Sequence, residues 1–299
     1  MEVLNIEHGK EEGKSHKKLK TLGSYTGKLK CLEGLSWILL LLYMTPFYLM
    51  FINSFKSRRE IFSDTTSLPK VWNISNYSTA MEKMDMLKSF GNSLIITIGG
   101  VLVILLFSSM AAWVLVRDKS KKSKIIFYVF TAGMIVPFQA VMLPLVKFMG
   151  KIRLGAFSMI GTHYGLIFMY LGFGASMSIF LYHGFIKGIP EEIEEAATID
   201  GCNKWQVYTK IVLPLLKPTT VTVAVLNGIW IWNDFLLPYL TVNGTATTIP
   251  LAMNNFFGAF SKQWELAMAA LVLSIIPIII FYFFAQKHII SGIVQGSIK

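Results

Sequence analysis

A polar and aromatic cluster interrupts an otherwise apolar stretch near residue 230. It comprises Asn227, Trp230, Asn233 and Asp234. Amide and carboxylate groups can pair with hydroxyls, and an indole face can stack on the apolar face of a pyranose. Because polar groups inside a membrane are costly unless they face protein or water, the cluster predicts that these side chains line a pathway for a sugar. Two structural roles fit the same residues, namely a tryptophan anchored at the interface and asparagines that bridge helices.

A second informative stretch is the polar segment 190–214, which separates two apolar runs. Pro190 suits the first position of a helix, and the acidic residues that follow it suit the positive N-terminal end. We expect this helix to end at Gly201. A second helix over about 203–211 would follow, until Pro214 deflects the chain. The segment therefore predicts a bent, compact projection, and helix capping alone would equally describe an ordinary loop.

The sequence contains little evidence for a metal site, a catalytic site or a nucleotide-binding site. His163 and His183 stand alone, without an H-E-x-x-H arrangement or a second ligand at helical spacing, so we expect no metal site. The apolar runs contain no G-x-S-x-G and no carboxylates paired at catalytic spacing, which argues against an intramembrane enzyme. The chain also lacks a G-x-x-x-x-G-K-[S/T] phosphate loop, and we expect no cofactor in it.

The elements that must position these groups are long apolar helices. Of the 299 residues 54% are hydrophobic and 15% are charged, a composition too apolar for an ordinary soluble domain. A helix needs roughly 20 apolar residues to cross about 30 Å of hydrocarbon. Six stretches qualify, at about 35–53, 92–116, 125–149, 160–183, 219–242 and 266–286. The sequence thus predicts an all-α integral membrane protein with six transmembrane helices, and the segment 190–214 lies between the fourth and fifth.

The charge distribution predicts the orientation. Most basic residues lie beside the apolar runs, as in the tail 1–34 and the short loop 117–124, so orientation in the bilayer explains the net charge of +11 better than nucleic-acid binding does. Positive loops stay in the cytoplasm, and six spans place both termini there. The segment 54–91 also carries basic residues, a partial conflict, although acidic residues accompany them. Cys31 and Cys202 then lie on the cytoplasmic side and are expected to stay reduced.

The spacing within 190–214 resembles a known signature. Glu195-Ala196-Ala197 is followed by Asp200 and Gly201, and then by Ile211, Leu213 and Pro214. This pattern resembles the EAA signature of bacterial ABC importer permeases. The resemblance implies that the segment forms coupling helices, which dock into a cleft on an ATP-binding subunit. By the same resemblance, Glu195 meets a basic group of that subunit, small alanines permit close approach, and Gly201 permits the turn.

The likeness covers nearly all of the chain after the basic tail. Asn53-Ser54-Phe55-Lys56, Leu68-Pro69 and the final residues 286–299 are similar to the smaller permease subunit of maltose-type carbohydrate importers. In that type the tail reaches the ATPase dimer interface, and most sugar contacts come from the other permease subunit. Asp234 fits the acidic position that follows Trp-Asn in related permeases, where a structural role is also possible. The lysine-rich tail before residue 34 is the main departure from the family.

The resemblance implies a set of partners. They are a second permease subunit, a dimer of ATP-binding subunits that carries ATP and Mg²⁺, an extracellular solute-binding protein, and a sugar or oligosaccharide. We expect a transmembrane domain over 35–287, a cytoplasmic tail over 288–299, and a location in the bacterial cytoplasmic membrane. An ion-coupled secondary transporter is the alternative, but Asp234 is nearly the only acidic group within the spans that could carry the coupling.

Overall fold

The computed structural model describes residues 2–154, 157–242, 244–258 and 262–297. These residues are mostly helical, as the sequence predicts. The strands β1 (Arg153–Leu154) and β2 (Phe157–Ser158) form a short antiparallel pair in which Arg153 faces Ser158. Residue 1 of the predicted N-terminal tail and residues 298–299 of the predicted C-terminal tail lie outside the described residues.

Three helices form the centre of the molecule. They are α4 (Met86–Arg117), α7 (His163–Ile186) and α11 (Lys217–Asn233), which pack against one another. The contact is close where Gly174 of α7 meets its neighbours, since a Cβ added there would lie 2.5 Å from Ile104 Cδ1 and 2.7 Å from Asn227 Oδ1. Small residues let helix backbones approach in this way, and van der Waals packing then stabilises the bundle.

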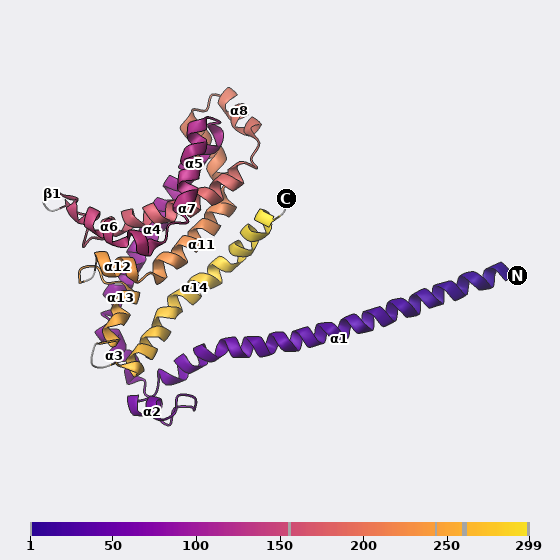
Figure 1. Cartoon of the computed structure of the whole chain (residues 1–299), viewed down its shortest axis with the longest axis horizontal. Coiled ribbons are helices and arrows are strands. Elements are labelled where there is room, and N and C mark those ends of the chain that lie inside the picture. Colours follow the sequence, from indigo (N-terminus) through magenta and orange to yellow (C-terminus); the bar gives the residue numbers. More distant parts are fainter. Residues whose placement is uncertain (1, 155–156, 243, 259–261, 298–299) are drawn as a thin grey trace.

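Two long helices flank this centre. The helix α14 (Trp264–Ser297) packs against α11, whereas α1 (Glu2–Asn53) contacts α14 near residue 53 and then diverges from the bundle (Figure 1). The apolar part of α1, Leu29–Asn53, is only 6% buried. Its apolar side chains therefore face outward over most of their length, as expected for a helix that contacts lipid or another membrane subunit.

The apolar helices agree in part with the six predicted spans. Among the described residues, four helices are long and apolar enough to cross a membrane by themselves, namely Leu29–Asn53, Met86–Arg117, His163–Ile186 and Trp264–Phe283. Two bent pairs raise the number to six if each pair is one span. The first joins α5 (Lys121–Gly133) to α6 (Phe138–Lys151) at 105°, and the second joins Lys204–Leu215 to α11 at 75°.

The predicted spans 125–149 and 219–242 each contain a break. The first is interrupted before Pro137, which caps α6, because a proline disfavours helical geometry in the preceding residue and donates no N–H. In the second, α11 ends at Asn233 and a short helix, α12 (Leu236–Thr241), follows. Asp234 has extended backbone geometry between them, with φ −72° and ψ 127°.

Short elements cluster at the end of the bundle opposite to α8 (Glu191–Ile199) (Figure 1). They are α2 (Arg58–Ser63), α3 (Ser75–Lys83), α13 (Ile249–Met253) and a 3₁₀ turn, Asn254–Phe256. The side chain of Lys56 is buried, and its Nζ donates to the Asp64 carbonyl at 2.9 Å. Asn76 donates to the carbonyls of Ser54 and Lys56. These bonds order the connection after α1.

Candidate functional site

The first half of the segment 190–214 folds as a capped helix. Pro190 is the N-cap of α8 rather than its first residue, and Glu191, Glu192 and Glu194 occupy the first turn. Carboxylates are favourable there because the unpaired N–H groups give this end partial positive charge. After Asp200, Gly201 has a φ of +90°, a value that glycine adopts without steric cost. The predicted helix and its glycine stop are confirmed, with a shift of one residue at the start.

The second half contains a tightly capped turn and then a wider one. The Asn203 and Gln206 side chains each bond the other residue's backbone N–H at 2.9 Å, which starts α9 (Lys204–Val207). A π-helical turn, Tyr208–Val212, and α10 (Leu213–Leu215) follow. Pro214 has no N–H, so it cannot continue the regular helical bonding. The chain then bends by 75° into α11, as the prolines predict.

The projection has an outward face and an inward face. Glu195, Ala196, Asp200 and Gly201 are exposed, and Ile199 and Trp205 expose 85% and 58% of their surface. Of the other predicted coupling residues, Leu213 and Pro214 are exposed, Ile211 is half-buried and Ala197 is buried. Exposed carboxylates beside exposed apolar side chains are typical of a surface that binds another protein.

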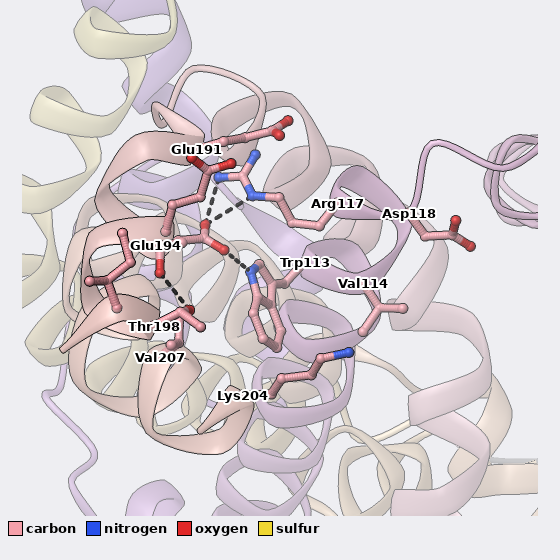
Figure 2. A pocket seen from close by; sticks show the side chains of 11 residues that line it. Trp113, Val114, Arg117, Asp118, Glu191, Glu194, Thr198, Lys204 and Val207 are labelled. Atoms are coloured by element: carbon pink, nitrogen blue, oxygen red, sulfur yellow. Dashed lines mark hydrogen bonds and ion pairs between the residues drawn. The ribbon is translucent and has the colours of Figure 1, made fainter. Parts of the chain in front are cut away.

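Glu194 faces inward and was not singled out by the sequence. Its side chain accepts hydrogen bonds from Arg117 Nε and Nη2 at 2.9 and 2.7 Å, and from Trp113 Nε1 at 2.9 Å (Figure 2). Arg117 Nη2 also donates to the Ile189 carbonyl at 3.1 Å. The partners are 77 residues apart, so no local spacing in the sequence could have revealed the pair. Sequence signals did locate Arg117 at the basic end of a span.

A surface cavity of about 840 Å³ lies beside this cluster, between α4 and α8 (Figure 2). Its lining includes Trp113, Arg117, Asp118, Glu195 and Lys204. Hydrogen bonds from the Ser123 and Ser120 hydroxyls lower the pKa of Asp118, which keeps this exposed carboxyl ionised. The cavity is therefore charged along its rim, and Figure 2 shows the Trp113 indole inside it.

The cluster on the fifth span divides into two pairs of residues. Asn227 is 1% exposed, and its amide donates to Ser178 Oγ at 3.0 Å and to the Val223 carbonyl at 2.9 Å. Asp234 accepts from the Tyr170 hydroxyl at 2.9 Å and from the Leu236 N–H at 3.1 Å. Both residues thus join α11 to α7. For Asn227 this is the helix-bridging role that the sequence left open, and for Asp234 it is the structural role.

The other pair occupies the open side of α11. Trp230 is 40% exposed and packs edge-on against Tyr170, with ring centroids 5.3 Å apart. Asn233 is exposed, and its amide donates to the Ile229 carbonyl of the same helix. These two residues keep an aromatic surface and an amide oxygen available to a ligand, so a sugar-lining role stays a prediction for them.

Comparison with known proteins identifies the class. Residues 104–295 match the family described as the binding-protein-dependent transport system inner membrane component. The chain belongs to this family. It is therefore a permease component of an ABC importer, and the alternative of an ion-coupled transporter is not favoured. Within the described residues, no cluster of three His, Cys, Asp or Glu side chains could hold a metal ion.

Three similar proteins give more detail about this permease, two through their sequences and one through its solved structure. A probable starch degradation products transport system permease protein from Thermoanaerobacterium thermosulfurigenes is 48% identical, over 90% of this chain and 96% of that protein. A multiple sugar-binding transport system permease protein from Streptococcus mutans is 35% identical, over 87% and 93%. A bacterial ABC transporter involved in alginate import shares the fold, with a TM-score of 0.70 at 23% identity over 85% and 93%.

Proposed function

We propose that this chain is one of two permease subunits of an ATP-driven importer for sugars or short oligosaccharides. The names of the curated relatives, which refer to starch degradation products and to multiple sugars, support this substrate class. The second permease subunit would complete the pathway. An extracellular solute-binding protein would deliver the sugar, and two ATP-binding subunits would carry ATP and Mg²⁺.

The proposed topology has six spans, namely the four long apolar helices, the bent pair of α5 and α6, and α11 with the residues that follow it to 242. The transmembrane domain covers 35–287, between a basic tail over 1–34 and a tail over 288–299, both cytoplasmic. The basic residues of the loop 117–124 support this orientation in the bacterial cytoplasmic membrane. The short elements α2, α3 and α13 then form the extracellular end, on the opposite side of the bundle from α8.

The proposed mechanism is alternating access. Closure of the ATP-binding dimer pulls on the coupling segment 190–214, and the resulting movement of the spans opens the translocation pathway to the outside. ATP hydrolysis returns the pathway to its inward-facing state. The outward position of Glu195 is the observation that carries this proposal, because it leaves a carboxylate free for a basic group of the ATP-binding subunit. Exposed Ala196 allows close approach, and Ile199 and Trp205 supply apolar contact area.

The proposed pathway surface is the open side of α11. Trp230 would stack against a sugar ring and Asn233 would bond a hydroxyl. Asn227 and Asp234 would hold this helix in place, since the Asn227 amide N–H and the Asp234 carboxylate bond side chains of α7. Because a permease pathway has two halves, we expect these contacts to supply only part of the binding.

The test combines a pull-down with uptake measurements. A tagged chain from its native membranes should retain a second permease, an ATP-binding protein and a solute-binding protein. Glu195→Ala should reduce retention of the ATP-binding protein and abolish uptake, whereas the control Glu192→Ala, on the same exposed helix, should do neither. Normal uptake by Glu195→Ala would refute the docking role. Recovery of an active chain without an ATP-binding protein would refute the importer.

A further inference from the structure

One side of α4 carries three residues spaced by four, which is the repeat that aligns side chains along a helix. They are Ser109, Trp113 and Arg117, the last residue of α4. Each of them contacts the segment 190–214. This row, here named the α4 latch, is a second connection between the coupling segment and the membrane helices, in addition to the chain itself.

The Arg117 end of the latch grips the first coupling helix. Both partners of the Arg117–Glu194 ion pair are largely buried, with 17% and 11% of their side chains exposed. Arg117 also bonds the Ile189 carbonyl at 3.1 Å, at the start of the projection. Such a pair has a strong geometric preference, and removing one partner leaves a buried charge without compensation.

The other end of the latch grips the π-helical turn. The Ser109 and Tyr208 hydroxyls are 2.7 Å apart, and Tyr208 is 1% exposed. Trp113 lies between the two ends, because its ring is 5.4 Å from that of Tyr208 while its Nε1 donates to Glu194. The latch therefore holds both halves of the coupling segment against a single helix.

The coupling segment is joined to α7 and α11 by a turn and a bend of the chain, whereas the latch joins it to one continuous helix. The segment leaves α7 through a turn at Gly188 and Ile189, and it enters α11 through a bend of 75°. By contrast, α4 is unbroken over 32 residues and has no internal proline, so it spans about 48 Å as one rod. Because α4 is continuous, a displacement of its Arg117 end can move the whole helix.

We propose that the α4 latch transmits movement of the coupling segment to α4, with Arg117, Trp113 and Ser109 as positioning residues. The proposal rests on the proposed function, in which an ATP-binding subunit moves this segment. Glu194 and Glu195 then have different roles in coupling. Glu195 faces the partner subunit, and Glu194 fixes the same helix to α4.

The test measures coupling rather than stability. The complete complex, with its second permease, ATP-binding subunits and binding protein, is reconstituted in liposomes, and maltotriose uptake and ATP hydrolysis are measured together. In Arg117→Ala we expect uptake per ATP hydrolysed to fall about tenfold, because the buried carboxylate loses its charged partner. Arg117→Lys should restore part of the ratio, since it keeps the charge without the fork.

Two further variants separate coupling from folding. Tyr208→Phe removes only a hydroxyl, and Trp113→Phe removes the indole N–H together with part of the ring while keeping an aromatic side chain. Each should lower the ratio with the complex still assembled. The control is Lys119→Ala, which breaks an ion pair to Glu191 that is 3.0 Å long and solvent-exposed, and it should leave the ratio unchanged. A wild-type ratio in Arg117→Ala, or in both phenylalanine variants, would overturn the latch. Absence of ATP-dependent uptake of every sugar and oligosaccharide tested with the wild-type complex would overturn the proposed function itself.

Discussion

Adjacent residues of this protein have opposite environments. Glu194 is 8% exposed and bonded to α4, whereas the next residue, Glu195, is exposed to solvent. Successive residues of a helix are about 100° apart, so one turn can serve a partner subunit and the chain's own core. The EAA pattern pointed to Glu195, and only the packed structure revealed Glu194.

Gly201 allows a test at the turn after α8. Its φ of +90° is costly for any side chain, by about 1–2 kcal/mol. Gly201→Asp should therefore insert into the membrane normally but misplace the coupling helices, weaken ATPase docking and abolish uptake. Membrane fractionation, pull-down and uptake measure the three effects. Gly184→Ala, at a glycine with no atom near the added Cβ, is the control and should transport normally.

The two asparagines of α11 should respond differently to substitution. Asn227→Ala removes the bonds to Ser178 and to the Val223 carbonyl, and we expect it to lower the free energy of unfolding by about 1–2 kcal/mol. Asn233→Ala should leave stability unchanged, because its side chain is exposed, and should raise the sugar concentration needed for half-maximal uptake. Thermal unfolding in detergent and uptake kinetics distinguish them. Equal thermal stability of both variants would contradict the bridging role of Asn227.

At the scale of the elements, close packing of α4, α7 and α11 depends on a small residue. Gly174 lies where the three helices meet, and a Cβ there would displace Ile104 or the Asn227 side chain. Dense cores accommodate extra volume poorly. The crossing at Gly174 therefore holds the three helices at a small separation.

Gly174→Ala should destabilise the bundle by about 1–3 kcal/mol, since the added methyl forces its neighbours to shift. Gly172→Ala is a matched control in the same helix, because no atom lies within 4 Å of the added Cβ. Apparent melting temperatures in detergent compare the two variants. A melting temperature for Gly174→Ala equal to that of the control would show that the helices are packed more loosely there.

The break between α11 and α12 shows how a polar side chain shapes an element. Asp234 bonds the Leu236 N–H and the Tyr170 hydroxyl, and so supplies a partner to a backbone group that the helix end leaves free. The sequence nevertheless predicts one span over 219–242, because hydropathy is averaged over a window and a single capping carboxylate changes that average little.

At the scale of the whole molecule, the two ends of the chain should matter unequally. The candidate span Leu29–Asn53 begins after residue 28, so deletion of 1–28 retains it. We expect transport to remain largely intact. Deletion of 287–299 retains the span Trp264–Phe283 but removes the end of α14, and it should impair coupling to ATP hydrolysis. Uptake assays on both truncations measure the difference, and equal effects would contradict it.

Local patterns in the sequence were sufficient to predict several features of this protein. Apolar runs, flanking basic residues and the Pro190 and Gly201 signals determined the membrane character, the position of the projection and its two helices, because each depends on residues close in the chain. Tertiary structure alone decided which side chains meet. The Arg117–Glu194 pair and the Asn227–Ser178 bond join residues 77 and 49 positions apart, and the facing of Trp230 and Asn233 depends on where α7 packs. Such contacts form only when helices dock, and their partners leave no periodic trace in one sequence.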